Sequence, residues 1–154
     1  MKVVLLRVGK GRNAWADAGV LEYARRLPRN LELEERLLRP ATFQGDPEAV
    51  KEEEARRILG ELKDGDRLFA LDERGEIPTS EGFAGWIDES ARLSCRRMVF
   101  AIGGPYGHGA AVRSASARVL ALSKMVLNHE LARMVLVEQL YRASTLLWGG
   151  AYHH

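Results

Sequence analysis

The sequence predicts an α/β fold with a mostly parallel sheet and helices on both of its faces. Short β-rich runs alternate with helical segments along the chain, which is the pattern of strand–helix–strand units. The run Met98–Ile102 is apolar at every position, as expected of a strand that is buried on both sides. The chain has 154 residues, of which 46% are hydrophobic, so it is long enough to form a core. We therefore expect a single domain spanning residues 1–154.

The first part of the chain predicts a strand, a helix and a second strand. Lys2–Val8 is β-rich and is expected to be a strand, followed by a turn at Gly9–Arg12. Asn13 is a residue type preferred at helix N-caps, so we expect a helix over Ala14–Leu27. Leu31–Arg39 alternates imperfectly between apolar and polar residues, which favours a strand.

The middle of the chain repeats this order. Asp46-Pro47 combines an N-cap residue with a proline suited to the first helical position, and it predicts the helix Pro47–Leu62. A strand is expected over Arg67–Asp72 and a loop over Glu73–Thr79. A further helix then begins at Ser80 and carries large apolar side chains.

The stretch that follows the strand Met98–Ile102 predicts a ligand site. The strand runs into a glycine-rich turn, a short Ala- and Ser-rich helical piece and a second apolar run, Val119–Leu122. Ser123–Leu127 is either a buried strand or a loop whose backbone binds a flat heterocycle, and the long helix His129–Trp148 comes next. Ligands of open α/β sheets bind at the carboxyl ends of strands, so a cofactor pocket is expected here.

Charge distribution and cysteine content indicate what kind of partner the protein binds and in which compartment we expect it. Net charge is +4 over residues 1–43, −8 over 44–91 and +6 over 92–154, which fits a polyanion partner or unevenly spread solvated charge. No apolar run is long enough to span a bilayer, and the N-terminus does not resemble a signal peptide. The single Cys95 excludes an internal disulfide, so we expect a cytoplasmic protein away from membranes.

Two motifs point to other chemistries. Gly9–Ala14 fits G-x-G-x-x-A, which favours a dinucleotide site, although Arg39 stands where an acidic ribose ligand is expected and no residues remain for a substrate domain. His129 and Glu130 open a helix, but Arg133 occupies the position of the second histidine of the zinc-protease motif. We therefore expect no zinc site and keep the dinucleotide interpretation as a minor alternative.

The last helix and the residues after it carry groups with two interpretations. Glu138 and Arg142 have the i, i+4 spacing of a surface ion pair, and Arg133 and Arg142 are also candidate functional cations. The helix is apolar on more than one face, which predicts a second packing partner such as another copy of the chain. Tyr152 and His153 are either a frayed terminus or functional side chains.

Several short motifs occur together in this chain: Ile102-Gly103-Gly104-Pro105, the run Leu122–Leu127, His129, Glu138–Ala143 and Tyr152-His153, with Trp15 and Glu22–Pro28 in the N-terminal half. Together they resemble the SPOUT, or α/β-knot, RNA methyltransferases over nearly the whole chain. The greatest similarity is to the small single-domain members that methylate N3 of a pseudouridine in large-subunit ribosomal RNA. The family's Leu-Pro-His-Pro is replaced by Leu127-Asn128-His129-Glu130.

The resemblance implies a C-terminal deep trefoil knot, S-adenosylmethionine as cofactor, a homodimer, and ribosomal RNA within the large subunit or assembled ribosome as substrate. By position it also implies the cofactor contacts, which are Leu71, Gly103, Leu122, Ser123, Lys124, Met125, Val126 and Leu127.

Methylation at N3 requires donor and acceptor to be held in line and the ring N3–H to lose its proton. The candidate general bases are His153, His129 and Tyr152, and the candidate cations that stabilise the developing charge are Arg142 and Arg133. No metal is required. Two alternatives remain: a SPOUT enzyme with another RNA target, and a non-catalytic module that binds RNA or the ribosome.

Overall fold

The computed structural model describes residues 1–9, 11, 13–150 and 152. Five parallel strands form one sheet in the order β2-β1-β4-β3-β5. The strands are β1 (Lys2–Val8), β2 (Glu32–Leu38), β3 (Asp66–Glu76), β4 (Arg97–Ile102) and β5 (Arg118–Leu120). The helices are α1 (Ala14–Ala24), α2 (Pro47–Gly60), α3 (Ser80–Arg92), α4 (Ala110–Ala115) and α5 (His129–Trp148).

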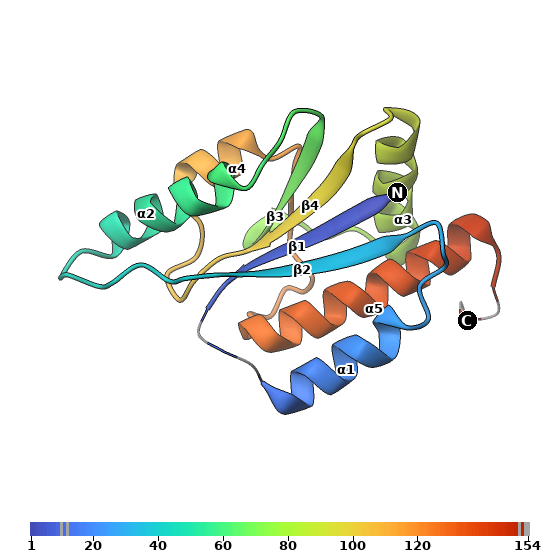
Figure 1. Ribbon diagram of the computed structural model, residues 1–154, viewed down its shortest axis with the longest axis horizontal. Coiled ribbons are helices and arrows are strands. Elements are labelled where there is room, and N and C mark those ends of the chain that lie inside the picture. Colours follow the sequence, from blue (N-terminus) through green and yellow to red (C-terminus); the bar gives the residue numbers. More distant parts are fainter. Residues whose placement is uncertain (10, 12, 151, 153–154) are drawn as a thin grey trace.

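Helices cover both faces of the sheet, as the sequence predicts (Figure 1). One core lies between the sheet and helices α1, α3 and α5, and the second lies between the sheet and helices α2 and α4. Alternate residues of β4 enter the two cores: Phe100 packs in the first and Val99 in the second. Strands β1 and β4 are central and apolar because both of their faces are covered.

The predicted elements are confirmed, with some different ends. The bounds of β1 and α5 agree with the prediction, and the Asp46 side chain caps α2 by accepting a bond from the Glu48 N–H. Helix α1 ends at Ala24 rather than at Leu27, because the chain turns where the Arg26 and Leu27 amides bond three residues back. Asn13 precedes this helix in extended conformation but makes no side-chain cap bond.

The predicted loop Glu73–Thr79 is wrong over its first four residues, since β3 continues to Glu76. A register shift separates Leu71 from Glu76 in the pairing of β3 with β5, and the Ala121 amide donates to the Glu76 carbonyl. The pairing that extends β3 comes from residues more than forty positions away. A local pattern of charged residues and glycine does not reveal such a partner.

The segment between β5 and α5 is a loop, which decides between the two interpretations of Ser123–Leu127. The Ser123 hydroxyl accepts a bond from the Met125 amide and supports a local turn. Asn128 ends the loop and caps α5, since its side-chain oxygen accepts from the Leu131 amide at 2.9 Å. Backbone groups of this loop are therefore available to a ligand.

Helix α5 joins the first core through its middle third. Leu136, Val137 and Leu140 are fully buried, whereas Leu131 and Trp148 near its two ends are exposed by 39% and 42%. Across the part of the chain that the structure describes, no helix is long and apolar enough to cross a membrane.

Candidate functional site

A cavity of about 270 Å³ lies where the carboxyl ends of β3, β4 and β5 meet. Leu71, Ile102 and Leu120 line it from these three strand ends. Its other walls are the part of β3 beyond its pairing with β4, the chain after β4 and after β5, and the start of α5: Asp72, Glu73, Arg74, Gly103, Gly104, Pro105, Tyr106, Gly107, Ala121, Leu122, Ser123, Met125, Val126, Leu127, His129 and Ala132. The position confirms the expectation of a pocket at the carboxyl edge of the sheet.

The glycine turn after β4 has no room for side chains at two positions. The Gly107 amide donates to the Gly104 carbonyl at 2.9 Å and closes the turn. A Cβ atom on Gly103 would lie 3.1 Å from the Gly107 carbonyl carbon, and one on Gly104 would lie 2.3 Å from the Glu54 carboxylate. Only glycine brings the backbone this close to its neighbours, so the turn presents bare peptide groups to the cavity.

Two buried polar side chains lie behind this turn. His108 is 2% exposed, and its Nε2 is 3.1 Å from the Ala101 carbonyl oxygen, a geometry in which Nε2 carries the proton and donates. Burial lowers the pKa of His108, so the ring is neutral near pH 7. Glu54 is also 2% exposed, and its Oε1 accepts from the Ala41 amide. These groups support the turn from the protein side.

Glu54 is not among the residues that the sequence predicts for this site, although its position on α2 carries a signal. Val50, Glu54 and Ile58 are spaced four residues apart on α2, so all three occupy the inner side of that helix, and all three are buried. A glutamate in the middle of an apolar helical stripe indicates a buried polar contact.

An ion-paired carboxylate forms one corner of the cavity. The Asp72 side chain is 4% exposed and contacts the Arg74 and Arg113 guanidinium groups at 3.0 and 3.4 Å. The hydrogen bond from Arg74 outweighs the effect of burial and lowers the pKa of Asp72 to about 2. Arg113 also donates to the His108 carbonyl at 2.7 Å, which ties this corner to the end of the glycine turn.

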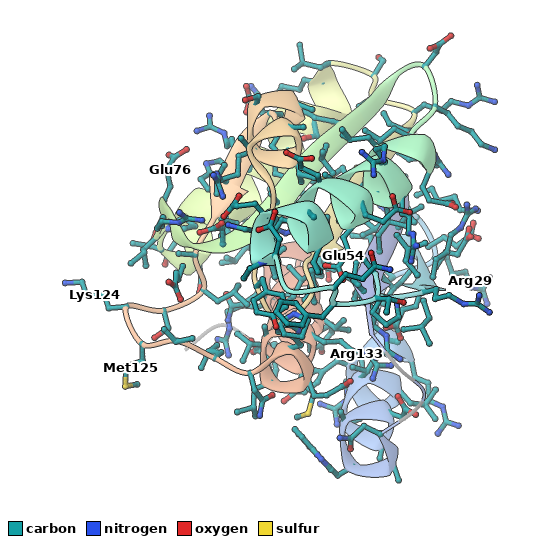
Figure 2. All side chains as sticks on the ribbon, turned by 90° about the vertical axis from the view of Figure 1, so that its left-hand side faces the viewer. Arg29, Glu54, Glu76, Lys124, Met125 and Arg133 are labelled. Carbon is teal, nitrogen blue, oxygen red and sulfur yellow. The ribbon has the colours of Figure 1, made fainter. Side chains whose placement is uncertain are left out.

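Seven of the eight predicted cofactor contacts line this cavity: Leu71, Gly103, Leu122, Ser123, Met125, Val126 and Leu127. Lys124 does not line it, and the Lys124 and Met125 side chains extend outward from the loop in Figure 2. Met125 and Val126 are each 75% exposed, so this wall has apolar side chains without a protein cover. His129, at the start of α5, also lines the cavity.

Arg142 and Tyr152 lie at the opposite end of α5. Arg142 is thirteen positions after His129, a separation of about 20 Å along a helix axis. The Arg142 guanidinium donates to Glu138 at 2.7 Å and lies 4.8 Å from the centre of the Tyr152 ring. His153 lies outside the described residues. A single chain therefore does not bring Arg142 and Tyr152 to the cavity.

Tyr152 packs among aromatic side chains at that far end. Its ring centre is 4.7 Å from that of Tyr141, and its hydroxyl donates to the Tyr23 hydroxyl at 3.3 Å. The hydrogen bond to Tyr23, with burial and Glu138 adding to it, raises the pKa of Tyr152 to about 12. A phenol with this pKa is protonated near pH 7, so Tyr152 is poorly suited to act as a base.

Arg133, a candidate functional cation in the sequence, is buried and ion-paired away from the cavity. It is 4% exposed, and its guanidinium bonds to Glu35, Asp17 and Glu130 at 2.7, 2.6 and 3.1 Å. These carboxylates come from β2, α1 and α5, so Arg133 joins three elements. It lines a second groove, beside α1 and β2, rather than the cavity at the strand ends.

The cavity has the features that S-adenosylmethionine requires. Leucine side chains from three segments provide an apolar wall suited to a flat heterocycle, and the glycine turn and the loop 121–127 bring backbone peptide groups to the edge of the cavity. Within the described residues, no three His, Cys, Asp or Glu side chains are grouped as metal ligands.

Comparison with known proteins gives matches over the full chain. The family described as predicted SPOUT methyltransferase matches residues 1–153. Curated relatives named ribosomal RNA large subunit methyltransferase H include those of Trichlorobacter lovleyi, 40% identical and covering all of both chains, and of Geobacter sp. and Porphyromonas gingivalis, each 39% identical and covering 100% of this chain and 99% of theirs. A family match of this extent, together with these identities, shows that the chain belongs to the SPOUT methyltransferases.

Proposed function

We propose that this protein is a single-domain enzyme, residues 1–154, that transfers a methyl group from S-adenosylmethionine to N3 of a pseudouridine in large-subunit ribosomal RNA. The observation that carries the proposal is the cavity at the strand ends. It is lined by the glycine turn, which precedes β5, and by the loop that follows β5, and both segments contain motifs of this family. Full-length similarity to relatives named as large-subunit ribosomal RNA methyltransferases supports the substrate.

Each wall of the cavity has a role in this proposal. Leu71, Leu122 and Leu127 would enclose the adenine of the cofactor, and backbone groups of Gly103 and of the loop 121–127 would hydrogen-bond its polar edge. The cofactor supplies an activated methyl group on a sulfonium. The protein holds that methyl in line with the acceptor nitrogen and excludes water, which accounts for much of the rate of such transfers.

The proton on N3 requires a base, and the resulting negative charge favours a nearby cation. His129 is the candidate base within one chain, because it lines the cavity. Arg142 is the candidate cation, Tyr152 offers a ring for stacking a base, and His153 is a second candidate base. Arg142 reaches a cavity if a second copy brings the far end of its α5 to the first copy's pocket. We therefore propose a homodimer with a composite site.

Exposed apolar side chains support a two-fold dimer. Leu21 and Leu37 are exposed by 47% and 45% and line the second groove, beside α1 and β2, together with Val20, Ala24 and Leu33. Trp15, also on α1, is exposed by 50%. A patch of this kind on a soluble domain indicates an interaction surface. We also propose that the C-terminal part of the chain forms the family's trefoil knot, and that the enzyme acts on ribosomes in the cytoplasm.

Calorimetry and nucleoside analysis test the function together. S-adenosylmethionine is expected to bind the purified protein and NADPH is not. Ribosomal RNA from a deletion strain is expected to lack one methylated pseudouridine, which returns when large subunits are treated with the enzyme and cofactor. Cofactor binding without any change in ribosomal nucleosides would refute the substrate, and binding of NADPH alone would favour the dinucleotide interpretation.

A further inference from the structure

Two exposed aromatic rings stack on each other at the rim of the cofactor cavity. Phe43, in the loop between β2 and α2, is 52% exposed, and Tyr106, in the glycine turn, is 43% exposed. Their ring centres are 5.7 Å apart with an interplanar angle of 27°. Tyr106 lines the cavity and Phe43 does not, so the pair extends from the cavity outward. Neither ring belongs to a hydrophobic core.

Contacts beneath the pair hold both loops in place. The buried Glu54 carboxylate accepts a bond from the Ala41 amide at 3.1 Å and fills the space above Gly104. Arg57 donates to the Arg39 carbonyl at 2.5 Å. One helix, α2, therefore braces both the loop that carries Phe43 and the turn that carries Tyr106. The rings are held toward solvent by this bracing and do not depend on their own stacking alone.

The chemistry of this surface favours a nucleobase over a phosphate. Asp46 and Glu48, at the start of α2 three and five residues after Phe43, are exposed and repel the RNA backbone. An aromatic face, in contrast, stacks on any unpaired base whatever its sequence. The exposed cation Lys124 belongs to the loop that forms a different wall of the cavity, where a phosphate is more favourably placed.

We propose that Phe43 and Tyr106 form a stacking platform for an unpaired base of the RNA, next to the nucleotide that is methylated. This inference rests on the proposed function, because the platform is assigned to the substrate of that reaction. It adds residues that the family motifs do not include. Splaying out and stacking of single-stranded bases is the usual way in which proteins hold RNA loops.

The test measures RNA affinity and cofactor affinity separately in Phe43→Ala, with Phe43→Tyr as the matched control. Binding of unmethylated large subunits is measured with the enzyme saturated in S-adenosylhomocysteine, so that no turnover occurs, and the KM for subunits is measured with S-adenosylmethionine. We expect Phe43→Ala to weaken subunit binding roughly 10-fold or more and to raise KM by a similar factor, with kcat and cofactor affinity unchanged. Phe43→Tyr keeps a stacking ring and should behave like the wild type.

Tyr106→Ala and Tyr106→Phe form a second pair, in which the alanine variant should weaken subunit binding by a similar factor and the phenylalanine variant should not. Because Tyr106 also lines the cofactor cavity, the cofactor affinity of both variants is measured first and subunit binding is compared at saturating S-adenosylhomocysteine. If both alanine variants bind subunits as tightly as the wild type and only melt at lower temperature, the rings are a packing pair and the platform is refuted. Failure of the proposed function has a different signature, because the wild type itself then leaves the subunits unmethylated.

Discussion

The two ends of α5 differ in what surrounds them. At the start of the helix, His129 faces a cavity whose wall includes the exposed Met125 and Val126. At the far end, Arg142 is ion-paired with Glu138 and packed against Tyr152. One end is open and built around bare backbone, whereas the other is filled with aromatic and charged side chains. One chain therefore holds the cofactor half of the candidate site at one end and the candidate cation at the other.

Arg133 lies between the two ends of α5 and holds this helix against α1 and β2. In Figure 2 it lies within the body of the molecule, away from the loop that carries Lys124 and Met125. Its three carboxylate partners tie α5 to α1 and β2. The length of the continuous helix sets the separation of the two ends, and the ion pairs hold its first third against α1 and β2, so α5 is not expected to bring Arg142 to the cavity of its own chain.

The largest expected effect is at the open end. Gly103→Val places a branched side chain against the Gly107 carbonyl and the His108 ring, where even a Cβ lies within 3.2 Å of all three nearest atoms. We expect this change to distort the turn and abolish S-adenosylmethionine binding by calorimetry. Gly85→Val, in α3 with open space around it, is the control and should bind normally. Undiminished affinity in a folded Gly103→Val protein would remove the turn from the cofactor site.

The second prediction tests whether the far end acts on the cavity of another copy. Arg142→Ala should leave cofactor affinity unchanged and reduce turnover by about 100-fold, as loss of a group that stabilises transition-state charge does. In a heterodimer of Gly103→Val with Arg142→Ala, one cavity is intact and faces an intact Arg142 from its partner. Activity should therefore return in the mixture. Two inactive variants that stay inactive together, with heterodimers demonstrated, would place Arg142 in its own chain's site or outside catalysis.

The third prediction contrasts the two arginines in stability. Arg133→Met removes the buried guanidinium that Asp17, Glu35 and Glu130 share, while Arg7 remains beside Glu35 and Glu130, so we expect a cost at the lower end of about 3 to 5 kcal/mol. For a domain of this size we expect the melting temperature to fall by roughly 6 to 20 °C. Arg142→Ala removes one partly exposed pair and should cost less than about 1 kcal/mol. Equal melting temperatures for the two variants would contradict the role of Arg133 in joining α1, β2 and α5.

The smallest effect is a pH dependence at the cavity corner. The pKa of Asp72 is about 2 in the folded protein, below its unfolded value, so its ionised form stabilises the fold above about pH 4. This stabilisation, of order 1 to 2 kcal/mol, is lost as pH falls toward 2. Asp72→Asn should lower the melting temperature at pH 7, and the difference from the wild type should shrink as the pH approaches 2. A difference independent of pH would show that Asp72 acts through packing instead.

Local sequence determined the elements that form without distant help. The continuous apolar run of β4, the proline and aspartate at the start of α2, and the full length of α5 with its glycine stop all agree with the structure. The pocket's position also follows from the sequence, because a strand end followed by adjacent glycines is a local feature. The resemblance added the cofactor and the residues around it.

Only the tertiary structure decided which charged groups are structural. Arg133 and Arg142 look alike in the sequence, yet partners on β2 and α1 bury one of them while the other stays partly exposed. Glu54 supports two loops because the Ala41 amide donates to its carboxylate and Gly104 packs against the same group. The extension of β3 to Glu76 needed β5 as a partner. In each case the deciding contact joins residues far apart in the chain, and periodicity and local propensity carry no information about such contacts.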